Sequence, residues 1–234
     1  MNSGLVLGIE TSGKTTGLAL VDSGRVVAEM VEDSDCGHNE VLMPLLDRLL
    51  RGAGVKVGEL SGIGVDMGPG MFTALRVGTS TAKGLAIAHR TPIVGLSSLW
   101  GLARTVAANL DGVLAVIDAR KQQVYTALYL DGKAAIQPSV MNPGELVSEV
   151  ARILSGRTSL VAAGNGTGIC ADLFAAAGIE IEATGVEVPS PGVIAIEAGE
   201  RIAKGQVDDI ASLEPLYLRR TDAELTREQK LGPK

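Results

Sequence analysis

Residues 5–31 read LVLGIETSGKTTGLALVDSGRVVAEMV. The apolar runs of this stretch are short, rich in β-branched residues and separated by turns of Gly, Asp, Ser and Thr. Such runs are typical of strands joined by hairpins. We therefore predict that the chain opens with three antiparallel strands and that Glu10 ends the first of them.

The same plan returns at residues 113–139, which read VLAVIDARKQQVYTALYLDGKAAIQPS. Asp118 ends the first apolar run of this copy, as Glu10 does in the first copy. Gly132 takes the place of Gly24 in the second turn, and each glycine follows its acid by 14 residues (24 − 10 and 132 − 118). Matching acids and turns at one offset indicate an internal repeat.

After each opening, segments with helical and strand-like patterns alternate. The patterns predict helices at 39–51, 72–88, 143–154, 168–177 and 191–204, and strands at 62–67, 92–96 and 160–163. This alternation after a meander favours mixed sheets flanked by helices. We therefore predict an α/β protein made of two tandem actin-like halves (the ASKHA, ribonuclease H-like architecture), in which the acid-ended first strands border a central cleft.

The expected division places an N-terminal actin-like half at 1–100, a C-terminal half at 101–220 and a charged, fraying tail at 221–234. Hydrophobic residues make up 46% of the 234 residues, which suits packed cores of this size. A net charge of −6 argues against a chain that grips nucleic acid unaided. Without a secretion signal or a long apolar run, we expect a cytoplasmic protein that does not contact the membrane.

Residues 8–15 read GIETSGKT and match the phosphate-binding pattern GxxxxGK[ST]. That pattern holds phosphate only where a helix follows the loop directly. Here Gly17 and the turn at 22–24 leave no room for a helix, and the spacing between them suits a strand. We predict a hairpin turn at this place, in which Lys14 has no part in function.

Residues 66–78 read DMGPGMFTALRVG. This segment resembles the GPG-x-FT-x-LR-x-G motif of the TsaB (YeaZ) family. Shorter matches follow the family's order along nearly the whole chain, with IETS at 9–12, IDAR at 117–120, GNG at 164–166 and PLYLR at 215–219. The chain departs from the family pattern at Met71 and at Asn165.

The resemblance implies a non-catalytic partner subunit of the bacterial tRNA N6-threonylcarbamoyladenosine transferase complex. Such a subunit binds and activates the catalytic subunit TsaD as a heterodimer, forms a homodimer by itself, works with a third subunit, the ATPase TsaE, and meets tRNA only through the complex. The alternative is a free-standing actin-like-fold small-molecule kinase or ATPase, in which Glu10 and Asp118 face each other across the cleft.

The helices at 39–51 and 72–88 carry wide apolar or small-residue stripes. Both stripes could simply cover the sheet, and half of their residues must do so. In the family these helices pair with counterparts in a partner, so the resemblance implies a partner interface. It would contain Val41, Leu42, Leu45, Leu49, Leu75, Gly78, Thr79, Ala82 and Ala86. On this hypothesis, a charge at Ala82 disrupts association and leaves the monomer folded.

Several residues are candidates for weak binding of a nucleotide or another anion, namely Thr11, Ser12, Gly68, Gly70, Gly164 and Gly166. We favour the plainer explanation, in which they satisfy turn backbone and allow tight packing. No cofactor is expected, although ATP or ADP in the cleft stays open. No metal is expected either, because His38 and His89 lie far apart in the sequence and are interpreted as surface or interface residues.

Overall fold

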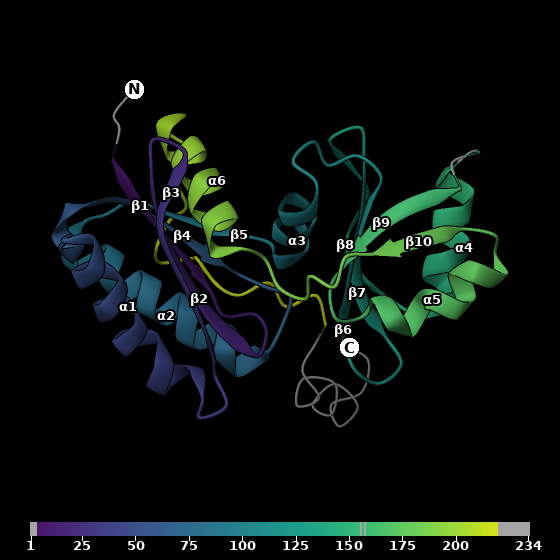
Figure 1. The fold of residues 1–234 in the computed structure, drawn as a ribbon, viewed down its shortest axis with the longest axis horizontal. Coiled ribbons are helices and arrows are strands. Elements are labelled where there is room, and N and C mark those ends of the chain that lie inside the picture. Colours follow the sequence, from purple (N-terminus) through teal and green to yellow (C-terminus); the bar gives the residue numbers. More distant parts are fainter. Residues whose placement is uncertain (1–3, 155, 157, 220–234) are drawn as a thin grey trace, which may run out of the picture.

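A computed structural model describes residues 4–154, 156 and 158–219. The chain folds into two lobes, each built around a five-stranded mixed sheet (Figure 1). The predicted tail at 221–234 lies outside the described residues. Within the described part of the chain, no helix combines the length and the apolar character that a membrane crossing requires.

The first sheet has the order β3-β2-β1-β4-β5. Its strands are β1 (Leu5–Glu10), β2 (Thr15–Asp22), β3 (Arg25–Asp33), β4 (Leu60–Asp66) and β5 (Ile93–Leu96). The first three form the predicted antiparallel meander, and β4 and β5 join it in parallel to β1. The carboxyl ends of β1 and β4 therefore lie side by side.

The second sheet repeats this plan with the order β10-β9-β6-β7-β8. Its strands are β6 (Val113–Asp118), β7 (Val124–Leu130), β8 (Lys133–Met141), β9 (Ser159–Ala163) and β10 (Glu180–Ala183). The meander is again antiparallel, and β9 and β10 again extend it in parallel. The internal repeat is therefore confirmed, although β10 had no clear signal in the sequence.

Helices α1 (His38–Ala53) and α2 (Phe72–His89) cover one face of the first sheet, and α6 (Pro191–Ala203) covers the other (Figure 1). Glycines in the sheet let α6 approach closely. A Cβ atom on Gly64 would lie 2.7 Å from the Cβ atom of Ala198, and one on Gly8 would overlap the carbonyl oxygen of Pro191. Thus α6, which falls within the range expected for the C-terminal half, packs in the first lobe.

The second lobe holds α3 (Ser98–Val106), α4 (Pro143–Leu154) and α5 (Thr167–Ala176). α3 packs on β6, β7 and β9, and it also contacts α6 of the first lobe. A short 3-10 turn, η1 (Val57–Glu59), leads into β4. Sequence patterns did not predict α3, which connects the two lobes.

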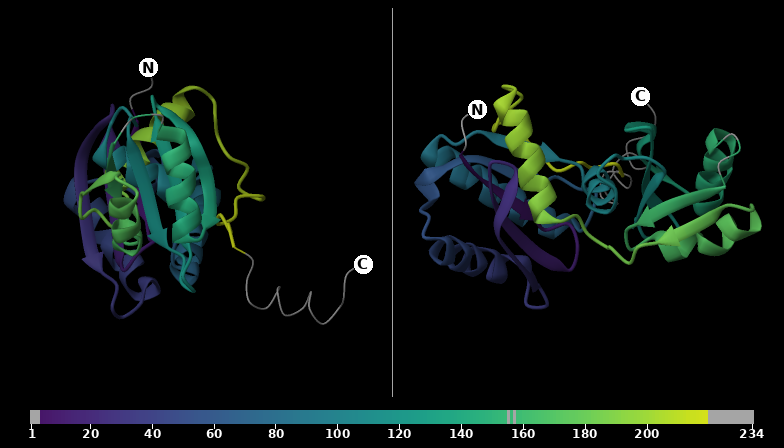
Figure 2. Two further views of the ribbon diagram at one scale, coloured as in Figure 1. Left: turned by 90° about the vertical axis from the view of Figure 1, so that its right-hand side faces the viewer. Right: turned by 45° about the horizontal axis from the view of Figure 1, so that its top comes forward.

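The segment after α6, residues 207–219, passes along the edge of the first sheet and ends against the second lobe (Figures 1 and 2, yellow). The backbone N–H of Asp208 donates to the carbonyl of Ile93, at 2.9 Å. Further on, the N–H of Leu216 donates to the carbonyl of Met67, at 2.7 Å. The guanidinium of Arg219 donates to the carbonyl of Ala119 in the second lobe, at 3.0 Å. This segment therefore joins the two lobes a second time, and we call it the C-terminal segment.

Candidate functional site

Two buried carboxyl groups lie together at the carboxyl-end edge of the first sheet. β1 and β4 are parallel with Ile9 paired to Val65, so Glu10 and Asp66 follow at the same level. The Glu10 residue is 1% exposed and Asp66 is 0% exposed. Sequence reasoning marked Glu10 but paired it with Asp118. The ends of adjacent parallel strands would have been the signal for Asp66.

The hydrogen bonds of this pair come from turns that follow the strands. The backbone N–H and the hydroxyl of Ser12 both donate to Oε1 of Glu10, each at 2.6 Å. The hydroxyl of Ser98 and the N–H of Gly68 donate to Oδ1 of Asp66, at 2.6 and 2.8 Å. Oδ2 of Asp66 is buried and receives no hydrogen bond from any described residue.

The protonation of the pair follows from its burial. Burial and, second to it, the neighbouring charge of Asp66 raise the pKa of Glu10 to about 8. Burial also raises the pKa of Asp66, to about 6, against the opposing hydrogen bonds from Ser98, Gly68 and Ser12. Glu10 therefore holds a proton at neutral pH. Both carboxyl groups are buried and hydrogen-bonded to the turns that follow their strands.

The Ser12 turn is in direct contact with the GPG loop, residues 68–70. The N–H of Met71 donates to the carbonyl of Ser12, at 2.8 Å. A Cβ atom on Gly70 would lie only 2.5 Å from the same carbonyl oxygen, so glycine is needed for this approach. Gly68 has a positive φ of 94°, which glycine adopts without strain. The loop thus links the buried carboxyl pair to the beginning of α2.

The residues predicted as candidates for anion binding make hydrogen bonds or close packing contacts with other parts of the chain. The hydroxyl of Thr11 donates to the carbonyl of Ala74 in α2, at 3.0 Å. In the second lobe, Gly166 packs so closely on β6 that a Cβ atom would lie 2.8 Å from the carbonyl carbon of Ile117. Gly164 has a positive φ of 109° and lies against Val116 of the same strand. These contacts support the tight-packing explanation, and the absence of a nucleotide stays a prediction.

The two acids of the kinase alternative have separate partners in the structure. The carboxylate of Asp118 accepts from the backbone N–H of Arg120, at 2.7 Å, and forms an ion pair with the guanidinium of the same residue, at 3.1 Å. Glu10 instead faces Asp66. Over the described ranges, no three His, Cys, Asp or Glu side chains gather closely enough to hold a metal ion. Of the two histidines interpreted as surface or interface residues, His89 is exposed, but His38 is buried at the start of α1, so that interpretation is wrong for His38.

The structure confirms the hairpin turn at 11–14. β2 begins at Thr15, directly after the turn, and pairs with both β1 and β3. The carbonyl of Lys14 accepts a hydrogen bond from the N–H of Ser34, at 2.9 Å. The segment therefore lacks the helix that the phosphate-binding pattern requires.

The predicted interface residues line the inner faces of α1 and α2. All nine except Val41 are buried, and those of α1 share a core with β1, β2 and β4. These eight residues are thus core positions and cannot form the partner surface. Ala82 is 0% exposed, so a charge there would unfold the lobe instead of only dissociating a partner.

The outer face of α2 is open and built from small side chains. Thr73, Ser80, Gly84 and Ala88 are exposed, and Val77 between them is half-buried. These positions recur every three or four residues, so they form one stripe along the helix. A Cβ atom on Gly84 would meet no atom within 4 Å. The face predicted from the sequence is also rich in small residues, so side-chain size alone does not show which of the two faces of α2 packs on the sheet.

The family model described as TsaD, tRNA N6-adenosine threonylcarbamoyltransferase, matches residues 26–226. The tRNA threonylcarbamoyladenosine biosynthesis protein TsaB of Escherichia coli K12 is 30% identical over 92% of this chain and 94% of its own length. TsaB of Bacillus subtilis is 31% identical over 94% and 96%. A tRNA N6-adenosine threonylcarbamoyltransferase of Nitratidesulfovibrio vulgaris is 41% identical over 46% of this chain and 33% of its own length.

Solved structures agree with this result. YeaZ from Pseudomonas aeruginosa superposes with a TM-score of 0.74 at 26% identity and covers 92% of this chain and 100% of its own. A ROK hexokinase from Thermus thermophilus, at a TM-score of 0.52 and 13% identity over 85% of this chain and 99% of its own, shares the fold alone. The tandem actin-like fold is confirmed, and the kinase alternative is not favoured. The chain belongs to the TsaB (YeaZ) family of tRNA threonylcarbamoyladenosine biosynthesis proteins.

Proposed function

We propose that this chain is the non-catalytic partner subunit of a tRNA N6-threonylcarbamoyladenosine transferase complex. It binds and activates a TsaD-like catalytic subunit through the outer face of α2 and the neighbouring part of α1. The observation that carries this proposal is the open stripe of small residues on α2, whose inner face is already filled by the chain's own core. Small side chains let a foreign helix approach closely along a line.

The partner is a protein of related fold. The family model of the transferases covers most of this chain, so a transferase can present an equivalent pair of helices. Two related helix pairs can then meet about a pseudo-two-fold axis, as two identical ones do in a homodimer. We expect roughly 800 Å² to be buried on each side. Self-pairing of this chain through the same stripe competes with the heterodimer.

The chemistry belongs to the partner in this proposal. Glu10 and Asp66 are enclosed and hydrogen-bonded by their own turns, which supports a structural role for them. With a net charge of −6, the chain meets tRNA only within the complex. The complex also contains a third subunit, an ATPase of the TsaE kind. We expect the complex to be located in the cytoplasm.

Reconstitution tests the proposal. The reaction contains the purified catalytic subunit, the third ATPase subunit, tRNA, ATP, threonine, bicarbonate and the enzyme that forms threonylcarbamoyl-adenylate. Modified adenosine is measured with and without this chain. We expect strong modification only when the chain is present, and none when it replaces the catalytic subunit. Equal modification without the chain would contradict the proposal.

A further inference from the structure

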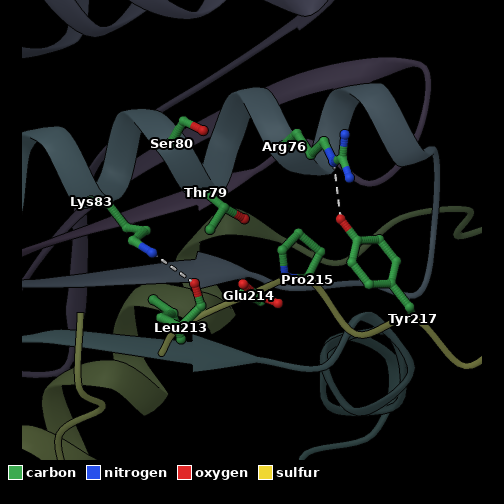
Figure 3. A pocket seen from close by; sticks show the side chains of 8 residues that line it. All are labelled: Arg76, Thr79, Ser80, Lys83, Leu213, Glu214, Pro215 and Tyr217. Atoms are coloured by element: carbon green, nitrogen blue, oxygen red, sulfur yellow. Dashed lines mark hydrogen bonds between the residues drawn. The ribbon is translucent and has the colours of Figure 1, made fainter. Parts of the chain in front are cut away.

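A pocket of about 280 Å³ lies between α2 and the C-terminal segment (Figure 3). α2 contributes Arg76, Thr79, Ser80 and Lys83, and residues 213–217 form the opposite wall. Arg76 and Lys83 are seven residues apart, which is two helical turns or roughly 10 Å along the axis. Their side chains therefore reach over the same pocket from the same helix.

Arg76 is held in a fixed orientation with part of its hydrogen-bonding capacity unused. Its Nε donates to the hydroxyl of Tyr217, at 3.1 Å, as Figure 3 shows. Its guanidinium carbon lies 3.9 Å from the ring centroid of Phe72. Within the described part of the chain it forms no ion pair, and its terminal amino groups have no acceptor. A guanidinium fork fixed in this way is prepared to bind a planar carboxylate.

Lys83 places a second positive charge at the other end of the pocket. Its ammonium group donates to the carbonyls of Leu213, at 3.0 Å, and Ala211, at 3.5 Å. An ammonium group has three donors, so one is left for a ligand. Among the described residues Lys83 forms no ion pair, and the acid that lines the same pocket, Glu214, pairs with neither cation.

The rim of the pocket has the composition of a binding surface. Phe72 and Tyr217 are exposed there, although they are large and apolar. The rings of Phe72 and Tyr217 lie 5.3 Å apart at their centroids. Aromatic residues, Met and Arg are enriched at the energetic centres of protein interfaces. Ser80 lines the pocket and also belongs to the outer stripe of α2, so the two surfaces are continuous.

We propose that this pocket receives an acidic side chain of the catalytic partner subunit, which Arg76 and Lys83 bind through its carboxylate. Apolar neighbours of that acid pack on Phe72 and Tyr217. The inference rests on the proposed function and adds the chemistry by which the partner is recognised. A protein segment fits better than RNA, because a polyanion needs a broad basic surface, whereas this pocket has two cations beside one acid in a chain of net charge −6.

The test is the affinity of this chain for the purified catalytic subunit, measured by calorimetry without tRNA at low and high salt. We expect Arg76→Gln to weaken binding by about 10- to 100-fold. Lys83→Gln should weaken binding less, and Glu214→Gln should strengthen it, because Glu214 is the one acid among the described residues that line the pocket. Lys133→Gln, an exposed cation of the second lobe, serves as the matched control and should leave the affinity unchanged.

Circular dichroism and thermal melting verify that each variant folds, and Arg76→Lys separates charge from the guanidinium geometry. Wild-type affinity of both Arg76→Gln and Glu214→Gln would overturn the inference and leave the proposed function standing. A loss that appears only in tRNA binding by the assembled complex would also overturn it, in favour of an RNA contact. If the wild-type chain does not bind the catalytic subunit at all, both the inference and the proposed function fail.

Discussion

The carboxyl group of Glu10 accepts both the backbone N–H and the hydroxyl of Ser12, at the end of β1 where Asp66 of β4 lies beside it. The same turn accepts the N–H of Met71, the residue that precedes α2. Hydrogen bonds through the Ser12 turn therefore connect the buried carboxyl pair to the beginning of α2, the helix that we propose as the docking surface.

Stability should fall as the pH rises, because of this pair. The pKa of Glu10 is 4.5 in a free chain and about 8 in the fold, so the folded protein keeps a proton that the unfolded chain releases. The contribution is complete below 4.5 and is lost as the pH rises to about 8. Asp66, raised from 3.8 to about 6, acts in the same direction.

The variant Glu10→Gln isolates this effect, because the amide oxygen can still accept the bonds from Ser12. We expect the free energy of unfolding of the variant, minus that of the wild type, to increase between pH 5 and pH 8, roughly the window between the two pKa values of Glu10. Urea unfolding at several pH values measures it. A difference that is constant with pH would show that Glu10 does not hold the proton.

Ala82→Glu should unfold the first lobe. The side chain is fully buried against the sheet, and an unpaired charge placed there costs about 3 kcal/mol or more. Chemical denaturation of the isolated chain measures the loss, with Ala88→Glu on the exposed face of α2 as the control. If Ala82→Glu kept wild-type stability but no longer bound the catalytic subunit, the inner face of α2 would be the interface.

Gly8→Ala should weaken the packing of α6 on the first sheet. The added methyl group would overlap the carbonyl oxygen of Pro191, which is backbone and cannot rotate away. We expect a loss of about 1–3 kcal/mol in the free energy of unfolding. Gly144→Ala, where a Cβ atom meets nothing within 4 Å, is the control and should cost nothing. Equal stability of the two variants would mean that α6 is not tightly docked.

Lys14→Ala should leave tRNA modification by the reconstituted complex unchanged. The residue lies in a hairpin turn that leads directly into β2, so it has no phosphate-binding helix beside it. Initial rates of modification with the wild type and with the variant provide the comparison. A collapse of activity in a normally folded variant would restore the phosphate-binding interpretation of residues 8–15.

The sequence predicts the repeated meander well because strand periodicity and turn residues are local signals. The helix predicted at 72–88 begins where α2 begins, because the GPG turn before it is a clear local signal. Its predicted end is one residue short of the end of α2. The return of α6 to the first lobe was not foreseen. It depends on the close fit of Gly8 and Gly64 to the helix, which is a contact distant in sequence.

The predicted interface failed for a related reason. An apolar stripe on a helix, such as Leu42, Leu45 and Leu49 on α1, shows which face is buried but not what buries it. The outer stripe around Gly84 is neither apolar nor strongly polar, so the hydrophobic periodicity of the sequence does not mark it as a surface of any kind. The pocket at Arg76 requires the C-terminal segment, more than 100 residues away, to pass beside α2.

The outer face of α2 is tested most directly by Gly84→Glu. The new side chain points into open space on an exposed helix position, so the chain should fold with at least wild-type stability. Gly168→Glu, equally open but on α5 of the second lobe, is the matched control. We predict by analytical ultracentrifugation that Gly84→Glu no longer forms a complex with the catalytic subunit, whereas Gly168→Glu does. Complexes of wild-type affinity with both folded variants would contradict docking through this face.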